Sequence, residues 1–259
     1  MHRQAILRTL GWTLLAFTTA FTTAVQAAAN VQTMRGDVRA NNVQLRSNDR
    51  LVSGSSIITG AGAQAVLRFD DGQTVVLNEN TTFKITDLRY RQDEPRGDRG
   101  IFDLVRGALR IISGAVASRN QAAFQLRVPQ ATIGIRGTDF MVAIVNPAVI
   151  SVGTGAVSAT NAGGTTVFGA GSFGSVASAS SLAVGIPASA VPAAASSAFS
   201  SMNAAAGVIG GGMAPGAVGV GAGVTAAGVL PSVLVIGGVV AVGASLTNDD
   251  NATTTHHAP

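Results

Sequence analysis

The chain has 259 residues, enough for one or two domains, and contains no cysteine, which excludes a disulfide framework and a thiol nucleophile. Its 17 basic and 13 acidic residues are too nearly balanced to indicate a nucleic-acid-binding protein. The three histidines, His2, His256 and His257, lie near the chain ends, so the interior of the sequence lacks the histidine that a catalytic triad or a histidine-bound zinc site requires.

Residues 1–29 are predicted to be a secretory signal peptide. A positively charged start precedes a mostly apolar, uncharged run over residues 10–25, and Val25-Gln26-Ala27 supplies the small residues that signal peptidase requires. Cleavage after Ala28 or Ala29 would also fit, and an anchor helix that stays attached is the alternative. Cleavage removes two of the 17 basic residues, which leaves 15 against 13 acidic residues and a net charge of +2. We expect a periplasmic or cell-envelope location.

Residues 30–178 carry repeated two-residue alternation of apolar and polar side chains, which predicts β-strands. The runs are short, recur at spacings near ten residues and are separated by glycine-containing turns. Residues 90–100 interrupt the alternation with mixed charges and are expected to be an exposed loop. The expected fold class is all-β, a short-stranded, twisted domain that is either β-solenoid-like or sandwich-like.

Asp70, Asp71 and Gly72 are the strongest hairpin signal, because Asp-Gly lies between the strand-like residues 65–69 and 74–77. Two adjacent carboxylates can act as a catalytic acid and base when their environments differ. Neighbouring acids at a hairpin tip far more often form the turn itself. We interpret them as a hairpin turn.

The stretch Gly134-Ile135-Arg136-Gly137-Thr138-Asp139-Phe140 is predicted to be a tight structural turn between the alternating residues 124–128 and 140–144. Its glycines permit backbone paths closed to other residues. Arg136 and Asp139 are expected to pair through charge-assisted hydrogen bonds and so hold the corner. The motif residues are Gly134, Arg136, Gly137, Thr138, Asp139 and Phe140. A ligand site is the alternative interpretation.

The second half of the sequence lacks Asp, Glu, Lys and Arg from Asn146 to Asn248. Residues 179–215 are rich in Ala, Ser, Gly and Pro and are expected to be a flexible linker. Residues 216–246 are apolar, glycine-rich and long enough to cross a bilayer, so they are predicted to bind a membrane or other copies of the chain. Pro231 and the lack of a following basic residue disfavour an ordinary anchor. Residues 247–259 are predicted to be a polar tail.

The stretch at residues 134–140 resembles the hallmark of the FecR protein domain family, and the resemblance extends over about residues 31–178. The other matching segments are a glycine-bounded strand at 50–60, a hairpin at 65–77, a strand signal at 107–110, and a closing hairpin at 161–164 with 169–171. Ser55 departs from the family, which usually has Asp there.

The resemblance implies a periplasmic all-β module. In the regulators that name the family, such a domain follows a membrane helix and a cytoplasmic anti-sigma segment, and receives a signal from an outer-membrane iron-siderophore transporter. Here the domain is predicted to follow a signal peptide directly. What the resemblance implies for this chain is a protein-interaction or envelope-scaffold module.

The expected function is therefore that of a non-catalytic, exported envelope protein without cofactor or metal. Its expected partners are envelope proteins, a membrane, or further copies of the chain through residues 216–246, and not nucleic acid. The first alternative is a periplasmic signal relay that works with a separate membrane or anti-sigma partner. The second is a carbohydrate- or peptidoglycan-binding module, which would need an aromatic platform. An enzyme has the least support.

Overall fold

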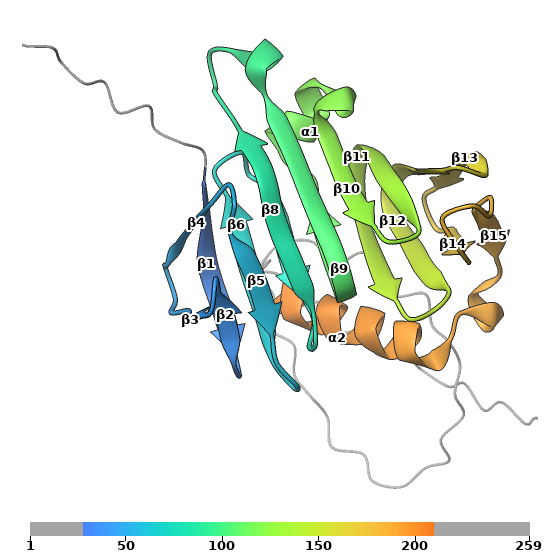
Figure 1. The fold of residues 1–259 in the computed structure, drawn as a ribbon, viewed down its shortest axis with the longest axis horizontal. Helices are drawn as coiled ribbons and strands as arrows, with labels where there is room; N and C mark the ends of the chain where they lie inside the picture. Colours follow the sequence, from blue (N-terminus) through green and yellow to red (C-terminus); the bar gives the residue numbers. More distant parts are fainter. Residues whose placement is uncertain (1–27, 210–259) are drawn as a thin grey trace, which may run out of the picture. The chain divides into compact units, whose positions relative to one another are not determined.

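The computed structural model describes residues 28–209, and the structural statements below concern these residues (Figure 1). The predicted signal peptide up to residue 27, the apolar residues 216–246 and the polar tail 247–259 lie outside this range. In the described range, no helix combines the length and the apolar character needed to cross a membrane.

The described chain is mostly β-structure, which confirms the predicted all-β fold class. The first strands are β1 (Ala28–Arg35), β2 (Val38–Ala40), β3 (Val43–Gln44), β4 (Arg50–Val52), β5 (Ser56–Thr59), β6 (Gln64–Phe69), β7 (Thr74–Leu77) and β8 (Thr82–Arg89). The next elements are η1 (Pro95–Gly97), β9 (Arg99–Ile112), α1 (Ala115–Arg119), η2 (Gln121–Ala123), β10 (Phe124–Val128), β11 (Ala131–Ile144) and β12 (Ala148–Asn161). The last are β13 (Gly164–Gly169), β14 (Phe173–Val176), β15 (Val184–Ile186), η3 (Ala188–Ala190) and α2 (Ala193–Ile209).

All 15 strands belong to one hydrogen-bonded sheet, in which β9, β11 and β12 are 14 residues long. The first part of β9 pairs with β8 and, in parallel, with β10, whereas its last part pairs with β7 and β11. In the same way β12 pairs with β14 near its start and with β13 near its end. The long strands thus join two layers of a single folded sheet.

Aromatic side chains show that the two layers face each other across a common core. Phe102, in the first part of β9, meets Phe69 of β6 edge-on with 5.5 Å between ring centroids. Phe102 also lies 5.6 Å from Phe83 of β8 and 5.7 Å from Phe124 of β10. All four rings are at most 3% exposed. Because the strands are almost all antiparallel and enclose one core, the sandwich-like alternative describes this fold better than a solenoid does.

Glycines allow the long strands to bend from one layer to the other without ending. Gly107 of β9, Gly137 of β11 and Gly155 of β12 have φ values of +86°, +55° and +75°, a region that favours glycine. The β11–β12 register shifts between Arg136 and Asp139. The prediction of a turn at residues 134–140 was therefore wrong: the stretch lies inside β11 and forms a bulge, which shares its glycine signal with a turn.

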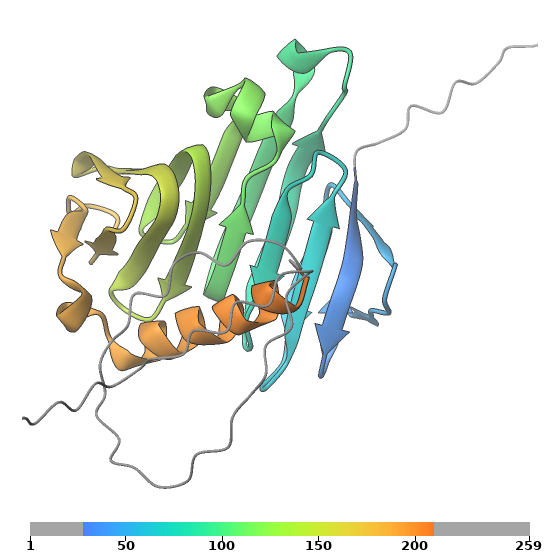
Figure 2. The same ribbon diagram turned by 180° about the vertical axis from the view of Figure 1, so that it is seen from behind.

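The prediction of a flexible linker over residues 179–215 was wrong for residues 179–209, which contain β15, η3 and α2. Figure 2 shows α2 lying across the outside of the sheet, and it packs on β7, β9 and β11. Its inner face presents Ala195, Ala198, Phe199 and Met202 at helical spacing. Alanine favours helix formation and lets the helix approach the sheet closely, while Phe199 and Met202 supply the larger buried surface.

Replacement of Phe199 by Ala should loosen α2 from the sheet. Phe199 is only 6% exposed, and removal of a buried phenylalanine ring costs about 3–5 kcal/mol. Hydrogen exchange should show faster exchange of the α2 amides in this variant. Ser200→Ala, at an exposed position of the same helix, is the control and should leave the exchange unchanged. Equal exchange in the two variants would show that α2 is not held by this contact.

Replacement of Gly107 by Ala should destabilise the whole domain. An added Cβ would lie 2.4 Å from Thr81 Oγ1 and 2.5 Å from the Thr81 Cα, at a backbone φ of +86°. We expect a loss of about 3 kcal/mol or more in urea unfolding. Gly62→Ala is the matched control, because Gly62 has a φ of +66° with nothing within 4 Å of the added Cβ, so only about 1 kcal/mol of backbone strain is expected. A similar loss in both variants would contradict the steric argument.

Candidate functional site

An ion pair between Arg110 of β9 and Asp139 of β11 joins the two bent strands. Arg110 Nε donates to Asp139 Oδ1 at 2.8 Å, and Arg110 Nη2 donates to Oδ2 at 2.6 Å. The side chains are 11% and 22% exposed. Arg110 Nη1 also donates to Asn203 Oδ1 on α2 at 3.0 Å. This fork-shaped, charge-assisted contact therefore links both strands to the helix that covers them.

The predicted Arg136–Asp139 pair was wrong in its partner. Arg136 is exposed, and Asp139 faces Arg110 instead. In the β9–β11 register Arg110 lies opposite Met141, two residues from Asp139, which is a diagonal distance that a long side chain spans. Asp139 thus pairs with Arg110 on the neighbouring strand β9 and not with Arg136, which lies three positions away on its own strand.

The other motif residues shape the β11 bulge. Thr138 is buried, and its hydroxyl donates to the Ala156 carbonyl at 2.9 Å while it accepts from the Arg136 N–H at 3.0 Å. A Cβ on Gly134 would lie 2.7 Å from Ser158 Oγ, and Phe140 is 1% exposed in the core. With these contacts Gly134, Gly137, Thr138 and Phe140 have packing and hydrogen-bonding roles in the bulge.

The hairpin carboxylates of the β6–β7 turn each bind a different element. Asp70 Oδ2 accepts from the Ala28 N–H at 2.9 Å and from Arg50 Nη2 at 3.1 Å. The buried Asp71 accepts from the Gln73 N–H at 2.9 Å and from the Val116 N–H, in α1, at 3.3 Å. Gly72, at a φ of +86°, completes the turn.

Burial raises the pKa of Asp71, although the backbone N–H groups of Gln73 and Val116 act in the opposite direction. With separate partners and a structural contact for each carboxylate, the arrangement of Asp70 and Asp71 is that of a turn whose side chains hold β1 and α1. The turn was predicted from Asp-Gly, but these two attachments were not, because Ala28 and Val116 are distant from the turn in the sequence.

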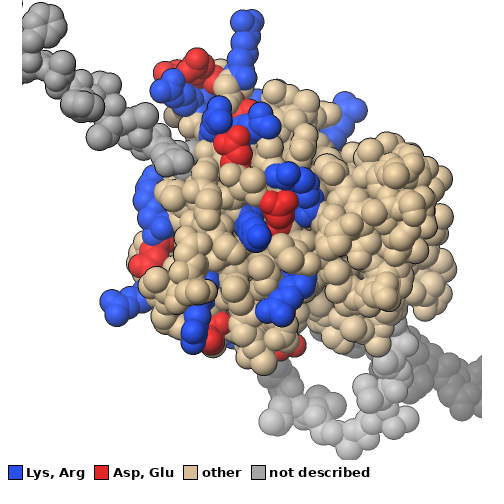
Figure 3. Space-filling view, in the orientation of Figure 1, with Lys and Arg blue, Asp and Glu red and all other residues tan. Residues whose placement is uncertain are grey.

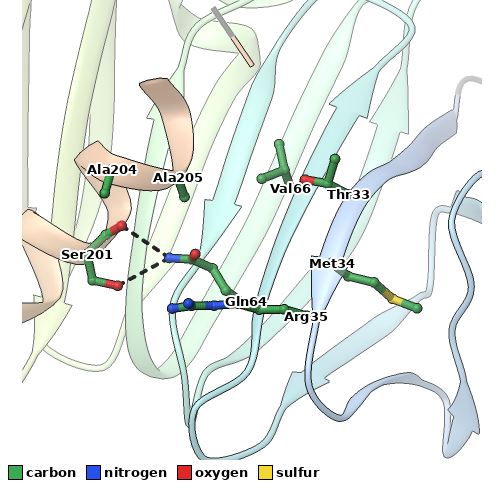
Figure 4. Close-up of a pocket in the computed structure, with 8 residues that line it drawn as sticks. All are labelled: Thr33, Met34, Arg35, Gln64, Val66, Ser201, Ala204 and Ala205. Atoms are coloured by element: carbon green, nitrogen blue, oxygen red, sulfur yellow. Dashed lines mark hydrogen bonds between the residues drawn. The ribbon is translucent and has the colours of Figure 1, made fainter. Parts of the chain in front are cut away.

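A groove of about 420 Å³ lies between α2 and the strands β1 and β6 (Figure 4). The Gln64 side chain points across the groove toward α2, and its Nε2 donates to Ser201 Oγ at 3.2 Å. A second hollow of about 320 Å³ shares Arg35 and Ser201 with the first. The full lining of the groove is Thr33, Met34, Arg35, Gln64, Val66, Ser201, Ala204 and Ala205.

The groove offers one cation, one amide and two hydroxyls, from Arg35, Gln64, Thr33 and Ser201, a set that suits binding rather than bond breaking. Over residues 28–209, no group of three His, Cys, Asp or Glu side chains could hold a metal ion. The groove could not be predicted from the sequence because it depends on α2, where Ser201 is the polar lining residue within an alanine-rich stretch.

The surface divides into a charged part and an uncharged part. Figure 3 shows the Lys, Arg, Asp and Glu side chains gathered on one side and none over the region of β12 to β15; the sequence has no such residue over residues 146–209. We call the surface of β13 and β15 the uncharged edge. It exposes Val167 at 65%, Val184 at 54% and nearby Leu182 at 48%.

Both strands of the uncharged edge have a single paired neighbour in the described sheet, β12 for β13 and β14 for β15. Sheet edges in natural proteins usually carry Lys, Pro or an inward-pointing charge, which prevents pairing with another chain. The Gly164–Gly169 segment contains none of these residues. Within residues 28–209 no second strand pairs with β13 or β15, and the Thr166 hydroxyl of β13 donates to the Ala183 carbonyl just before β15 at 2.6 Å.

Arg110→Ala and Asp139→Ala should each lower the free energy of unfolding by about 2–3 kcal/mol, because each leaves a largely buried charge without its partner. The double variant should lose less than the sum of the two single losses, by about 1 kcal/mol or more. Arg136→Ala is the control, and exposed substitutions of this kind change stability by about 0.5 kcal/mol or less. Urea unfolding measures all four variants, and a loss at Arg136 equal to that at Arg110 would refute the assignment of the pair.

Residues 55–158 match the family model described as FecR protein. Two crystal structures, each of a candidate anti-sigma factor from Parabacteroides distasonis ATCC 8503, at 1.65 Å and 2.50 Å resolution, are similar to this chain with 16% and 17% identity and TM-scores of 0.40 and 0.41. Each comparison covers 51% of this chain and 58% of the other, so the chain spans little more than half the length of those proteins. No curated protein matches the sequence. The part of the chain that is similar to the FecR protein family, residues 55–158, runs from the turn before β5 into the second half of β12.

Proposed function

We propose that this chain is a non-catalytic, exported envelope protein whose FecR domain binds another protein. The observation that carries the proposal is the uncharged edge, where exposed valines on β13 and β15 lie on strands with one unpaired side each. A protein that presents such an edge would otherwise risk unspecific association, so an edge left open is best explained by a partner.

The mode of binding that suits this edge is strand addition. An extended segment of the partner would lie beside β13 and form backbone hydrogen bonds with it, while its side chains meet Val167 and the neighbouring threonines. Thr165, Thr166 and Val167 are β-branched and favour an extended backbone. With no charge on this part of the surface, the partner segment would be apolar or uncharged at its alternate positions.

The arrangement of acids supports a binding role over catalysis. The two adjacent carboxylates, Asp70 and Asp71, have separate backbone partners, and Asp139 is engaged by Arg110. Histidine is confined to positions 2, 256 and 257. A general acid–base mechanism would need a titratable pair converging on a substrate cavity, whereas the groove beside α2 is lined by one cation and uncharged side chains.

Export rests on the basic start, the apolar run and the cleavage motif within residues 1–29. Residues 216–246 would then hold the protein to a membrane or to other copies of itself, as their length and uncharged composition suggest. The FecR domain would thereby be kept at the envelope, with the uncharged edge available to a neighbouring protein.

A signal relay is the second candidate, and the FecR match favours it because the family contains domains that pass a signal through a membrane partner. A neighbouring gene for a sigma factor, and a change in transcription on deletion of this chain, would favour the relay over a scaffold. The carbohydrate alternative has less support, since every aromatic side chain in residues 28–209 is buried or half-buried and Tyr90 is covered by Arg119 at 5.1 Å from the ring centroid.

Val167→Lys should abolish partner binding without loss of stability. Val167 is 65% exposed on β13, so a lysine there is tolerated but disfavours strand addition. Val43→Lys, at a 68% exposed valine on the edge strand β3, is the matched control. A photo-crosslinking residue placed at position 167 should capture an envelope protein. The same residue placed at position 43 should not capture that protein. Equal capture at both positions, or binding that survives Val167→Lys, would contradict the proposal.

A further inference from the structure

We propose that signal peptidase cuts between Ala27 and Ala28, and that Asp70 binds the ammonium group which this cut creates on Ala28. The proposal rests on the proposed export of the chain. It adds a processing site that leaves the contacts of β1 complete and an intramolecular binding site for the new N-terminus, at the tip of the β6–β7 hairpin.

Ala28 and Asp70 already make a reciprocal contact. The Ala28 N–H donates to Asp70 Oδ2 at 2.9 Å, and the Asp70 N–H donates to the Ala28 carbonyl at 3.0 Å. Arg50 Nη2 donates to the same Asp70 Oδ2 at 3.1 Å. Ala28 therefore has its nitrogen beside a carboxylate at the point where β1 begins.

The sequence permits cleavage after Ala27, Ala28 or Ala29, and the three products would keep different contacts in the folded domain. Ala28 pairs with Val52 of β4, and Ala29 pairs with Leu51 of β4 and with Phe69 of β6. Cleavage after Ala28 would remove both reciprocal hydrogen bonds to Asp70. Cleavage after Ala28 would remove one fully buried side chain, and cleavage after Ala29 would remove two. Only the cut after Ala27 keeps all of these contacts.

The cut changes the chemistry of the contact. Water adds to the Ala27 carbonyl carbon, the bond from that carbon to the Ala28 nitrogen breaks, Ala27 keeps a carboxylate, and the Ala28 amine takes up a proton. The single amide donor thereby becomes an ammonium with three donors and a positive charge. Its hydrogen bond to Asp70 becomes charge-assisted and shorter, and Asp70 then lies between two cations, the new terminus and Arg50.

The pH dependence of stability follows from the sign of this interaction. An α-amino group has a pKa of about 7.7–8.0 in an unfolded chain. Asp70, in direct contact at 2.9 Å, favours the charged form of this amine, whereas Arg50 on the same carboxylate oxygen disfavours it, and we expect the direct contact to dominate so that folding raises the pKa. The stabilisation is therefore fully present below about pH 7.5 and is lost as the pH rises through the folded-state pKa. For a contact that is partly exposed, the expected change in the folding equilibrium constant is about two- to fivefold.

Two measurements test the proposal. The first is the intact mass of the protein recovered from the envelope fraction of cells that express the full chain. A chain that begins at Ala28 supports the site, whereas one that begins at Ala29, Asn30 or Met1 overturns it. If the chain stays uncut in the cytoplasm, both the export proposal and the processing site fail, but the binding of the ammonium by Asp70 is still decided by the second measurement.

The second measurement compares two purified chains that both end at residue 259, one beginning at Ala28 and the other at Ala27. The extra residue in the second chain moves the ammonium group away from Asp70. Urea unfolding at pH 7 and pH 9.5 should show a two- to fivefold larger loss in the folding equilibrium constant for the chain that begins at Ala28. Asp70→Asn should remove this difference, and Asp37→Asn, which alters an exposed ion pair with Arg39, should preserve it. The same pH response in both chains would overturn the binding of the ammonium by Asp70.

Discussion

The fold depends on three long strands that must pass from one layer to the other while staying hydrogen-bonded on both sides. At Gly155 of β12 an added Cβ would lie 2.3 Å from the Gly137 carbonyl oxygen of β11, so the two neighbouring strands fit together only because Gly155 lacks a side chain, while the φ of +55° at Gly137 also favours glycine. Around the bends, Thr138 links β11 to β12 and the Arg110–Asp139 pair links β11 to β9. The core, the position of α2 and the exposure of the uncharged edge all follow from this bending.

The all-β class, the β6–β7 hairpin and the mixed-charge loop could be predicted because they depend on local signals. Alternation marks a half-buried strand whatever lies beside it, and Asp-Gly marks a turn through the backbone freedom of glycine. At residues 134–140 the same local signal was ambiguous, since a glycine at positive φ serves a bulge as well as a turn. Strand pairing decides between them, and pairing is a property of the whole sheet.

The partner of Asp139 and the docking of α2 could not be read from the sequence for the same reason. Arg110 and Asp139 are brought together by the β9–β11 register, and Asn203 joins them from a helix far along the chain. The alanine-rich composition of residues 193–206 suggests a weak core when the segment is considered alone. When the segment packs on the face of the sheet, the same small side chains permit a close approach. A segment with few large apolar residues therefore forms an ordered helix.

The uneven distribution of charge also decides how this protein can be observed. Arg136 is the last basic residue, so trypsin has no cleavage site from Gly137 to Pro259, and a tryptic digest reports the uncharged part of the chain only as one very long, poorly detected peptide. Lys84 is the only lysine, which leaves amine-reactive cross-linkers no side chain on β12 to β15. Contacts made by that surface would escape standard peptide mapping, and proteases that cleave at aromatic or small aliphatic residues are needed to detect them.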